Sequence, residues 1–401
     1  MMEGWKKEKL ANVFSFHNGK KIKPNGQGEH IAFGSNGPIG NSEKTLFDTG
    51  IIIGRVGAYC GSVIMPKEPF WASDNTIVVR VKEGYDQNFM SYYLSLLNLN
   101  WYAGGSAQPL LTHGWLKPIK INLPPLPTQR KIASILSTYD DLIENNLKCI
   151  KLLEEKAQLT YEEWFVRMKF PGHETKPINK ETGLPEGWER KKINEIADFQ
   201  NGYAFYTKGY SDSGYAVIDL ANVSEWGDLN ITGKEKFISE ELYESLPKFH
   251  LQKYDIIIAM TDVTSALRIL AKSAIIDKDN TYALNQRVGM LRPNTDLFDY
   301  SFLYALLGDI RLIERMKAMS KGAVQFYFNT KDIVNYETFV PSKEIIDEFV
   351  KQYKPILELR MKLKDQNQLL KEARDMLLPR LMTGMIDVKK MKLENLQSTT
   401  A

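Results

Sequence analysis

The sequence is poor in cysteine and histidine, the residue types on which disulfide scaffolds and zinc sites depend. Its two cysteines, Cys60 and Cys149, cannot form a disulfide framework, so a disulfide-stapled secreted domain is excluded. We expect both to be reduced thiols of a cytoplasmic protein. The five histidines are scattered and show no paired metal-ligand spacing, so we expect no metal site.

Long hydrophobic runs are also missing. A membrane-spanning helix needs about 18 apolar residues or more. The two best stretches are broken by charge, since residues 51–65 contain Arg55 and residues 256–276 contain Asp262 and Arg268. The N-terminus shows no apolar signal-peptide segment. We therefore expect no membrane association and a cytoplasmic location.

Neither sign of charge dominates the chain. The 52 basic and 49 acidic residues leave a net charge of +3. Such a small excess predicts no partner by itself, so any basic surface for nucleic acid must be local. With 401 residues, of which 43% are hydrophobic, the chain is long enough for two or three globular domains.

Catalytic motifs are missing as well. Residues 34–40 are glycine-rich but lack the dinucleotide-binding spacing, and Gly19-Lys20 lacks the phosphate-loop spacing. Residues 122–126 differ from the Asn-Pro-Pro-aromatic motif of amino methyltransferases by an extra leucine and by the lack of an aromatic residue. We therefore expect no catalytic residues, which disfavours an enzyme with nuclease or methyltransferase activity of its own.

What the sequence does contain is an internal repeat. Motifs of the first copy recur 183 residues later near its start and 217 residues later near its end. The change in separation indicates that the second copy has gained insertions in its first two thirds and none in its last third. The matching segments are Gly4-Trp5 with Gly187-Trp188, Asn18-Gly19 with Asn201-Gly202, Gly105 with Gly322, and Gln108 with Gln325.

Each copy begins with a strand-rich part. Short β-branched runs bounded by Gly, Pro and Asp predict strands, and longer apolar patterns predict two helices. This mixture predicts an α+β fold. The predicted strands are residues 51–53, 62–65, 76–81, 215–220, 255–260 and 287–291, and the predicted helices are residues 88–97 and 300–319.

Each copy ends in a long amphipathic helix. Residues 128–168 contain neither Pro nor Gly, and their heptad pattern places Asn146 at an a position. In the second copy the matching a positions run from Phe349 to Leu377, with Leu359 at a d position. Two such stripes can pack on each other, with Asn146 setting their register. Connectivity then favours an antiparallel pair with one domain at each end.

These patterns predict two similar mixed α/β domains held apart by a coiled-coil pair of helices. The expected parts are a domain at residues 1–126, a long helix at 127–170, a linker rich in Pro and Gly at 171–183, a second domain at 184–340, a second long helix at 341–387 and a polar tail at 388–401.

The order of the motifs along the chain is informative. Gly-Trp and Asn-Gly open each copy, an apolar strand leads into Gly54-Arg55-Val56-Gly57, and residues 105–109 precede residues 123–133 at the start of the long helix. This order resembles the specificity subunits of Type I restriction–modification enzymes, over essentially the whole chain. In the second copy, residues 341–344 replace the Pro-Leu-Pro-x-Gln block, so the match is weaker there.

The resemblance implies that each mixed domain is a target recognition domain that reads one half of a bipartite, asymmetric site in double-stranded DNA. The helices would set the spacer and dock two adenine methyltransferase subunits, which a translocating endonuclease subunit can join. Those partners would carry S-adenosylmethionine, ATP and Mg and flip the target base. This chain would bind no cofactor of its own.

Candidate DNA contacts follow from residue type and position. Phosphates attract cations, and base edges are read mainly by Arg, Lys, Asn or Gln side chains in a groove. Such residues, with nearby hydroxyl-bearing ones, occur in loops beside the repeated motifs. The candidates are Lys20, Lys21, Lys23, Arg55, Tyr59, Gln108, Tyr203, Lys208, Thr264, Arg268, Gln286, Arg287, Lys321 and Gln325.

A different class of function would also suit the heptads. A two-domain coiled-coil adaptor that does not bind DNA needs the same pair of helices. That alternative explains neither the cations and glutamines in the loops nor the order of the motifs, so we favour DNA recognition.

Overall fold

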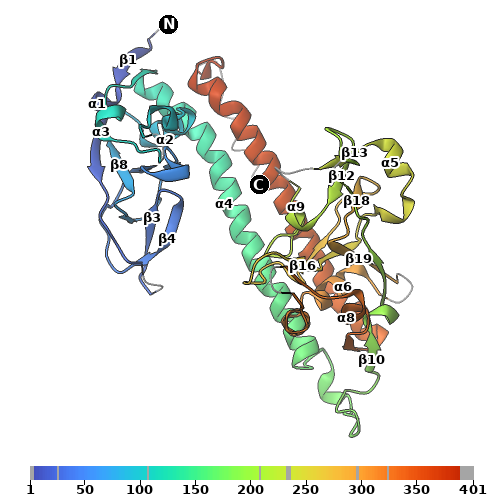
Figure 1. Ribbon diagram of the computed structural model, residues 1–401. Helices are drawn as coiled ribbons and strands as arrows, with labels where there is room; N and C mark the ends of the chain where they lie inside the picture. The colour runs from blue at the N-terminus through green and yellow to red at the C-terminus, as the bar shows by residue number, and fades with distance from the viewer. Residues whose placement is uncertain are drawn as a thin grey trace. The chain divides into compact units, whose positions relative to one another are not determined.

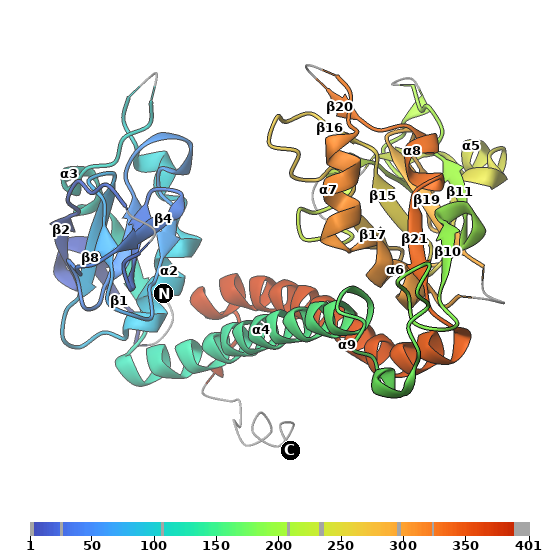
Figure 2. The same cartoon turned by 90° about the horizontal axis from the view of Figure 1, so that it is seen from below.

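The structure divides into two compact units, each of which contains part of both long helices. The computed structural model describes residues 4–24, 27–105, 108–206, 209–231, 236–294, 298–322 and 325–388. The first unit is Met1–Lys148 with Leu363–Ala401, and the second is Cys149–Lys362. The long helices α4 (Leu126–Tyr161) and α9 (Lys343–Met382) each continue from one unit into the other (Figure 1 and Figure 2). Residues 389–401 of the expected tail lie outside the described residues.

The first unit is built from two small sheets and a strand pair. Its strands are β1 (Lys6–Lys9), β2 (Phe14–Asn18), β3 (His30–Gly34), β4 (Gly37–Ser42), β5 (Ile51–Gly54), β6 (Val63–Ile64), β7 (Trp71–Ala72), β8 (Thr76–Val81) and β9 (Lys120–Leu123), and its short helices are α1 (Leu10–Val13), α2 (Gln87–Leu96) and α3 (His113–Leu116). The sheets have the orders β2-β8-β5-β6 and β4-β3-β7, and β1 pairs with β9. The strand predicted at residues 76–81 is confirmed.

The second unit repeats this plan with additions. Its strands are β10 (Glu189–Lys192), β11 (Ala197–Asn201), β12 (Tyr215–Ile218), β13 (Phe237–Ile238), β14 (His250–Leu251), β15 (Ile256–Ala259), β16 (Thr261–Asp262), β17 (Ser273–Ile275), β18 (Tyr282–Leu284), β19 (Val288–Pro293), β20 (Phe326–Tyr327) and β21 (Glu337–Val340), and its short helices are α5 (Glu240–Glu244), α6 (Tyr300–Leu307), α7 (Ile310–Ala318) and α8 (Thr330–Val334).

The sheet orders of the two units correspond strand by strand. The order β11-β19-β15-β17 repeats β2-β8-β5-β6, and β13-β12-β18 repeats β4-β3-β7, including the parallel pairing of its last two strands. The additional strand β14 and helix α5 lie in the segment that the sequence identified as longer in the second copy. The internal repeat and the α+β class are therefore confirmed.

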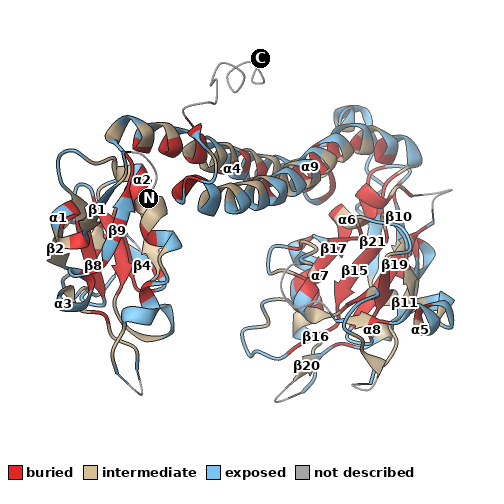
Figure 3. Ribbon diagram, turned by 90° about the horizontal axis from the view of Figure 1, so that it is seen from above, coloured by how far each residue is buried: buried red, intermediate tan, exposed pale blue. Residues whose placement is uncertain are grey.

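The central strand of each unit is apolar at every position because it separates two cores. Alternate residues of a strand point to opposite faces. In β5, Ile51 and Ile53 face the core that contains α2, while Ile52 faces a second core with Phe33 and Phe70. Strand β15 is divided in the same way, and Figure 3 shows it buried. A strand covered on both faces gives the continuous apolar run that predicted it.

One predicted helix is wrong in extent. Residues 300–319 form two helices, α6 and α7, rather than one. The break falls at Gly308 and Asp309, where the Asp309 carboxylate accepts a hydrogen bond from the backbone N–H of Arg311 and so caps the start of α7. Aspartate competes for the backbone in this way at helix starts, which ends the continuous pattern.

The two long helices pack antiparallel in each unit. In the first unit Arg374 of α9 donates to Asp140 of α4 at 2.6 Å, and in the second Arg360 donates to Glu154 at 2.7 Å. As the residue number rises along α4, that of its partner falls along α9. Leu359, predicted at the seam, is instead exposed, and its neighbour Arg360 is buried there. The π-helical turn at Glu162–Val166 follows the end of α4.

Asn146, predicted at an a position of the helix seam, is buried there and pairs with Asn367, which the sequence analysis did not identify. Asn146 donates a hydrogen bond to Asn367 Oδ1 at 2.9 Å, and Asn367 donates to the carbonyl of Ile143 at 3.4 Å. Both amides are buried, so a shift in register would leave them without partners. None of the helices in the described part of the chain is long and apolar enough to cross a membrane.

Candidate nucleic-acid interface

The candidate residues of the first unit leave the main sheet at one edge. Strands β2 and β5 both end where β8 begins. The backbone N–H of Gly19 donates to Thr76 O at 3.3 Å, and that of Arg55 donates to Asn75 O at 2.9 Å. The loop with Lys20, Lys21 and Lys23, all exposed, therefore begins at the same sheet edge as the segment from Arg55 to Tyr59.

The repeated Asn-Gly motif has a steric cause. A Cβ on Gly19 would lie 1.9 Å from Ser73 O, and one on Gly202 would lie 2.0 Å from Asn285 O. Only glycine allows the chain to pass this close to the backbone that follows β7 in the first unit and β18 in the second. The motif thus fixes where the loop after it begins in both units.

The described ends of a second loop, residues 104–105 and 108–110, lie against the same edge. Its ends are joined by paired hydrogen bonds between Gly104 and Leu110 at 3.0 and 2.9 Å, and Gly57 donates to Pro109 O at 3.1 Å. A Cβ on Gly57 would lie 3.8 Å from Gln108 Nε2. The structure therefore brings Arg55, Tyr59 and Gln108 into one region.

The second unit builds the same loop on the same hydrogen bonds. Lys321 and Tyr327 exchange backbone hydrogen bonds at 2.8 and 3.0 Å, as Gly104 and Leu110 do in the first unit. Phe328 N donates to Met260 O at 3.2 Å, as Leu111 N donates to Arg55 O at 2.9 Å. The loop with Lys321 and Gln325 therefore lies beside β16.

The glycine and glutamine shared by the two loops are linked through the backbone. Gly105 and Gly322 have φ values of +98° and +109°. A Cβ there would lie 2.5 Å from Gln108 O and 1.9 Å from Gln325 O, respectively. This close approach explains why glycine recurs at this position. The Gln108 side chain is exposed, and that of Gln325 is half-buried.

The loop after β16 is organised by Asp262, which the sequence reasoning missed. Its carboxylate accepts hydrogen bonds from the N–H and hydroxyl of Thr264, both at 2.8 Å, and from Ile269 N at 2.9 Å. Burial alone would raise the pKa of Asp262, but these hydrogen bonds outweigh it and hold the pKa below its usual value. The Asp-x-Thr pattern, typical of an Asx turn, was the available signal.

The candidate DNA contacts of the second unit differ in how exposed and how strongly paired their side chains are. Arg268 is exposed but pairs with Glu225 at 3.3 Å, so its charge is partly offset. Gln286 and Arg287 are exposed at the sheet edge, where Gln286 N donates to Tyr203 O at 2.9 Å. Tyr203, Gln286 and Arg287 are thus brought together. Lys208 lies outside the described residues.

Arg55 and Lys117 both lie near His113. Burial, Lys117 and Arg55 together lower the pKa of His113, which favours its neutral form. Within the described residues, Arg55 Nε and His113 Nε2 are buried and have no hydrogen-bond partner.

Exposed aromatic side chains lie in the chain on either side of the loop that contains Gly104 and Gln108. The sequence analysis did not identify them. Trp101 is 84% exposed, and Tyr102 and Trp115 are also exposed. A Cβ on Gly104 would lie 2.2 Å from the Trp115 ring, which therefore packs on the loop backbone. Aromatic residues shortly before a glycine pair were a usable signal, since rings stack on bases and line interfaces. In the described part of the chain, no cluster of His, Cys, Asp or Glu side chains suits a metal ion.

Comparison with known proteins places both copies in one family. Residues 2–155 and 185–369 match the family model described as the Type I restriction modification DNA specificity domain. The chain is 26% identical over 357 residues to the MjaVIII Type I specificity subunit of Methanocaldococcus jannaschii, covering 88% of this chain and 82% of that protein. It is 40% identical over 111 residues to the EcoprrI specificity subunit of Escherichia coli, covering 27% and 28% of the two chains.

A solved structure shares the fold. The S subunit of a Type I restriction–modification system from M. genitalium aligns with a TM-score of 0.65 at 17% identity, over 94% of this chain and 96% of that chain. The two segments matched by the family model cover most of the sequence and coincide with the two copies of the repeat. The chain therefore belongs to the family of Type I restriction–modification DNA specificity proteins, and it carries two specificity domains.

Proposed function

We propose that this chain is the non-catalytic DNA-recognition subunit of a Type I restriction–modification complex, and that each domain reads one half of a bipartite, asymmetric site. The observation that carries the proposal is a single loop framework, built twice on equivalent hydrogen bonds, that presents different side chains in each unit. We expect this subunit to be located in the cytoplasm, where a bacterial or archaeal host keeps its DNA.

The difference between the two side-chain sets supports an asymmetric target. Arg55 stands in the first unit where Met260 stands in the second, and Lys20 stands where Tyr203 stands. Base edges are distinguished by the donors and acceptors that meet them. One framework with two different sets of donors would therefore read two different half-sites.

Exposed apolar residues at equivalent helix positions support the docking of two copies of one partner. Leu152 and Leu159 on α4 correspond, 217 residues later, to Leu369 and Met376 on α9, and all four are exposed. Paired apolar positions one heptad apart form a stripe on a helix, and exposed patches of this kind mark interaction sites. We propose two adenine methyltransferase subunits as the partners, with a translocating endonuclease subunit joining them.

In this proposal the partners supply the chemistry. S-adenosylmethionine would be held by the methyltransferases, and ATP and Mg by the endonuclease subunit, while this chain binds none of them. Double-stranded DNA would be its own ligand, met by the cationic and amide side chains at the two sheet edges.

Each docking stripe can be tested separately. We expect Leu152→Glu and Leu369→Glu each to remove one methyltransferase from the complex, because a buried carboxylate without a partner opposes docking. Native mass spectrometry of the co-expressed complex measures the stoichiometry. Leu147→Glu is the matched control, since this exposed leucine corresponds to Lys364 in the second copy and is expected to leave both partners bound. A full complex with both stripe variants would contradict the proposed docking.

The recognition function itself is tested in the host. The gene is deleted, and methylated adenines are mapped across the genome before and after. The proposal predicts a bipartite, asymmetric motif that loses methylation on deletion and regains it when the gene is restored. An unchanged methylation map, with no methyltransferase copurifying with the chain, would overturn the proposal and favour an adaptor that does not bind DNA.

A further inference from the structure

The domain of the first unit is joined to the helix pair by an apolar contact near the start of α4. Phe89 and Met90 of α2 pack in one core with Ile132 and Leu136 of α4, and the end of α9 contributes Leu381 to the same core. An apolar joint is strong but not directional. By itself it allows the domain to pivot about this point.

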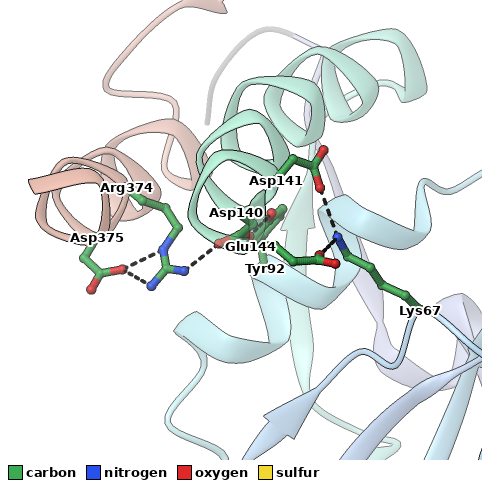
Figure 4. Close-up of polar contacts among 7 residues, drawn as sticks. All are labelled: Lys67, Tyr92, Asp140, Asp141, Glu144, Arg374 and Asp375. Carbon is green, nitrogen blue, oxygen red and sulfur yellow. Dashed lines mark hydrogen bonds and ion pairs between the residues drawn. The ribbon is translucent and has the colours of Figure 1, made fainter. Parts of the chain in front are cut away.

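A polar contact from α2 lies further along α4. The Tyr92 hydroxyl donates to one oxygen of Asp140, and Arg374 of α9 donates to the other at 2.6 Å. Figure 4 shows Asp140 between these two partners. Arg374 also holds Asp375, at 2.8 Å. Burial, together with the Asp140 hydrogen bond, raises the pKa of Tyr92, so the hydroxyl remains a donor. One carboxylate thus links the domain to both long helices.

A third contact comes from a different part of the domain. Lys67, in the loop between β6 and β7, reaches Asp141 at 3.0 Å and also contacts Glu144 (Figure 4). Glu144 in turn pairs with Lys148 at 2.8 Å along the same helix. The loop of Lys67 and the helix of Tyr92 are separate elements, so the domain contacts α4 through two different parts of its chain.

The polar contacts and the apolar contact hold the domain at separate points along α4. Leu136, in the apolar joint, and Glu144, in the Lys67 pair, are eight residues apart on α4, a distance of about 12 Å along a helix. Two attachments separated along a rod oppose rotation, which neither opposes alone. The charged and hydroxyl groups also have directional geometry, unlike the apolar joint.

The second unit has a contact of the same kind made from different residues. The Tyr300 hydroxyl of α6 lies 3.2 Å from the Glu358 carboxylate of α9. Glu358 corresponds to Asp141 in the repeat, while Asp140 corresponds to Leu357. The two domains thus share a tyrosine-to-carboxylate contact with their long helix, although the individual positions differ.

We propose that Lys67 and Tyr92, held by Asp140, Asp141 and Glu144, fix the angle of the first recognition domain on the helix pair and thereby determine which spacer length the complex accepts. These are positioning residues that need not touch DNA. The inference rests on the proposed function, because a spacer exists only for a bipartite site.

The physical requirement comes from the geometry of DNA. Adding or removing one base pair moves one half-site by about 3.4 Å along the duplex and turns it by about 34°. A domain held at two points cannot follow that displacement without breaking a contact. A domain that pivots on the apolar joint alone can move with the displaced half-site. The complex would then methylate sites with altered spacers more readily.

The test uses the complete complex and DNA substrates that differ only in spacer length. Methylation rates are measured for the natural spacer and for spacers one base pair shorter and longer, with half-sites unchanged. For Lys67→Met combined with Tyr92→Phe, we expect the rate ratio of altered to natural spacer to rise about tenfold. Most of this effect comes from losing the half-buried hydrogen bond between the Tyr92 hydroxyl and the charged Asp140, since the exposed Lys67 pairs contribute less. Lys67→Arg with Tyr92 retained should keep the wild-type ratio.

The control is Lys151→Met, which removes an exposed pair with Glu155 that lies within α4 alone, at 3.9 Å. It should leave the spacer ratio unchanged. An unchanged ratio in the double variant would overturn the inference, as would an equal fall in rate on all three substrates. If the wild-type complex methylates no bipartite site at all, the proposed function itself fails, which distinguishes the two results.

Discussion

Replacing Arg360 with methionine is expected to lower the free energy of unfolding by about 3 kcal/mol, because it removes a buried guanidinium whose charged hydrogen bonds join α9 to α4 and to the recognition domain. Arg360 lies in α9 with only 8% of its side chain exposed, donates to Glu154 of α4 at 2.7 Å and contacts Asp228 of the recognition domain. One guanidinium therefore joins three parts of the second unit. Methionine has a similar volume, so the loss of stability reports on charge and not on a cavity.

The measurement is urea denaturation of the purified chain, followed by circular dichroism. Arg268→Met is the matched control, since Arg268 is 65% exposed and pairs with Glu225. Exposed pairs contribute less than about 1 kcal/mol, so its effect should stay below that. Equal effects of the two substitutions would contradict the proposed role of Arg360 as the link between the helices and the domain.

Replacing Arg55 with alanine is expected to weaken binding to the specific DNA site by about tenfold to a hundredfold, the usual effect of removing an arginine that reads a base. Arg55 follows directly after the central strand, and its backbone anchors both Asn75 and Leu111. Since alanine retains these backbone bonds, the loop should keep its place. Fluorescence anisotropy on cognate DNA, and on DNA altered in one half-site, measures the change.

The DNA sequences on which Arg55→Ala weakens binding identify the role of the Arg55 side chain. Weaker binding confined to cognate DNA indicates base reading by Arg55, and equal weakening on all sequences would contradict it.

Lys20, Lys21 and Lys23 are expected to contact phosphates and not bases. Their replacement by alanine should reduce the dependence of binding on salt by about one unit of slope for each phosphate that is no longer neutralised. Lys120→Ala, an exposed lysine on β9, serves as the control.

Periodic and repeated features of the fold could be predicted from the sequence. The central strands β5 and β15 gave apolar runs because both of their faces are buried. Asn146 was recognisable as a polar residue within an apolar heptad, and its partner Asn367 lies where antiparallel pairing places it. The Asn-Gly and Gly-x-x-Gln motifs recur because the backbone approaches itself too closely for any other residue than glycine.

Features that depend on distant or irregular contacts could not be predicted. Lys67 and Asp141 are 74 residues apart in the chain, and neither residue type signals a partner. The loop closed by Asp262 depends on side-chain hydrogen bonds to its own backbone, which propensity does not encode. Leu359 was placed at the helix seam by a regular heptad, whereas a buried arginine occupies that part of the seam in α9. The ion pairs of Arg360 with Glu154 and Asp228 hold the arginine in the seam, where the heptad pattern predicted an apolar residue.

The central claim is that each domain reads its own half of a bipartite site. It is tested most directly by replacing residues 1–126 with the corresponding domain of a relative of different specificity and mapping the methylated adenines in the host. The account predicts a new motif in which one half-site changes while the other half-site is retained. A motif that changes in both halves, or in neither half although the exchanged chain assembles with its methyltransferases, would contradict it.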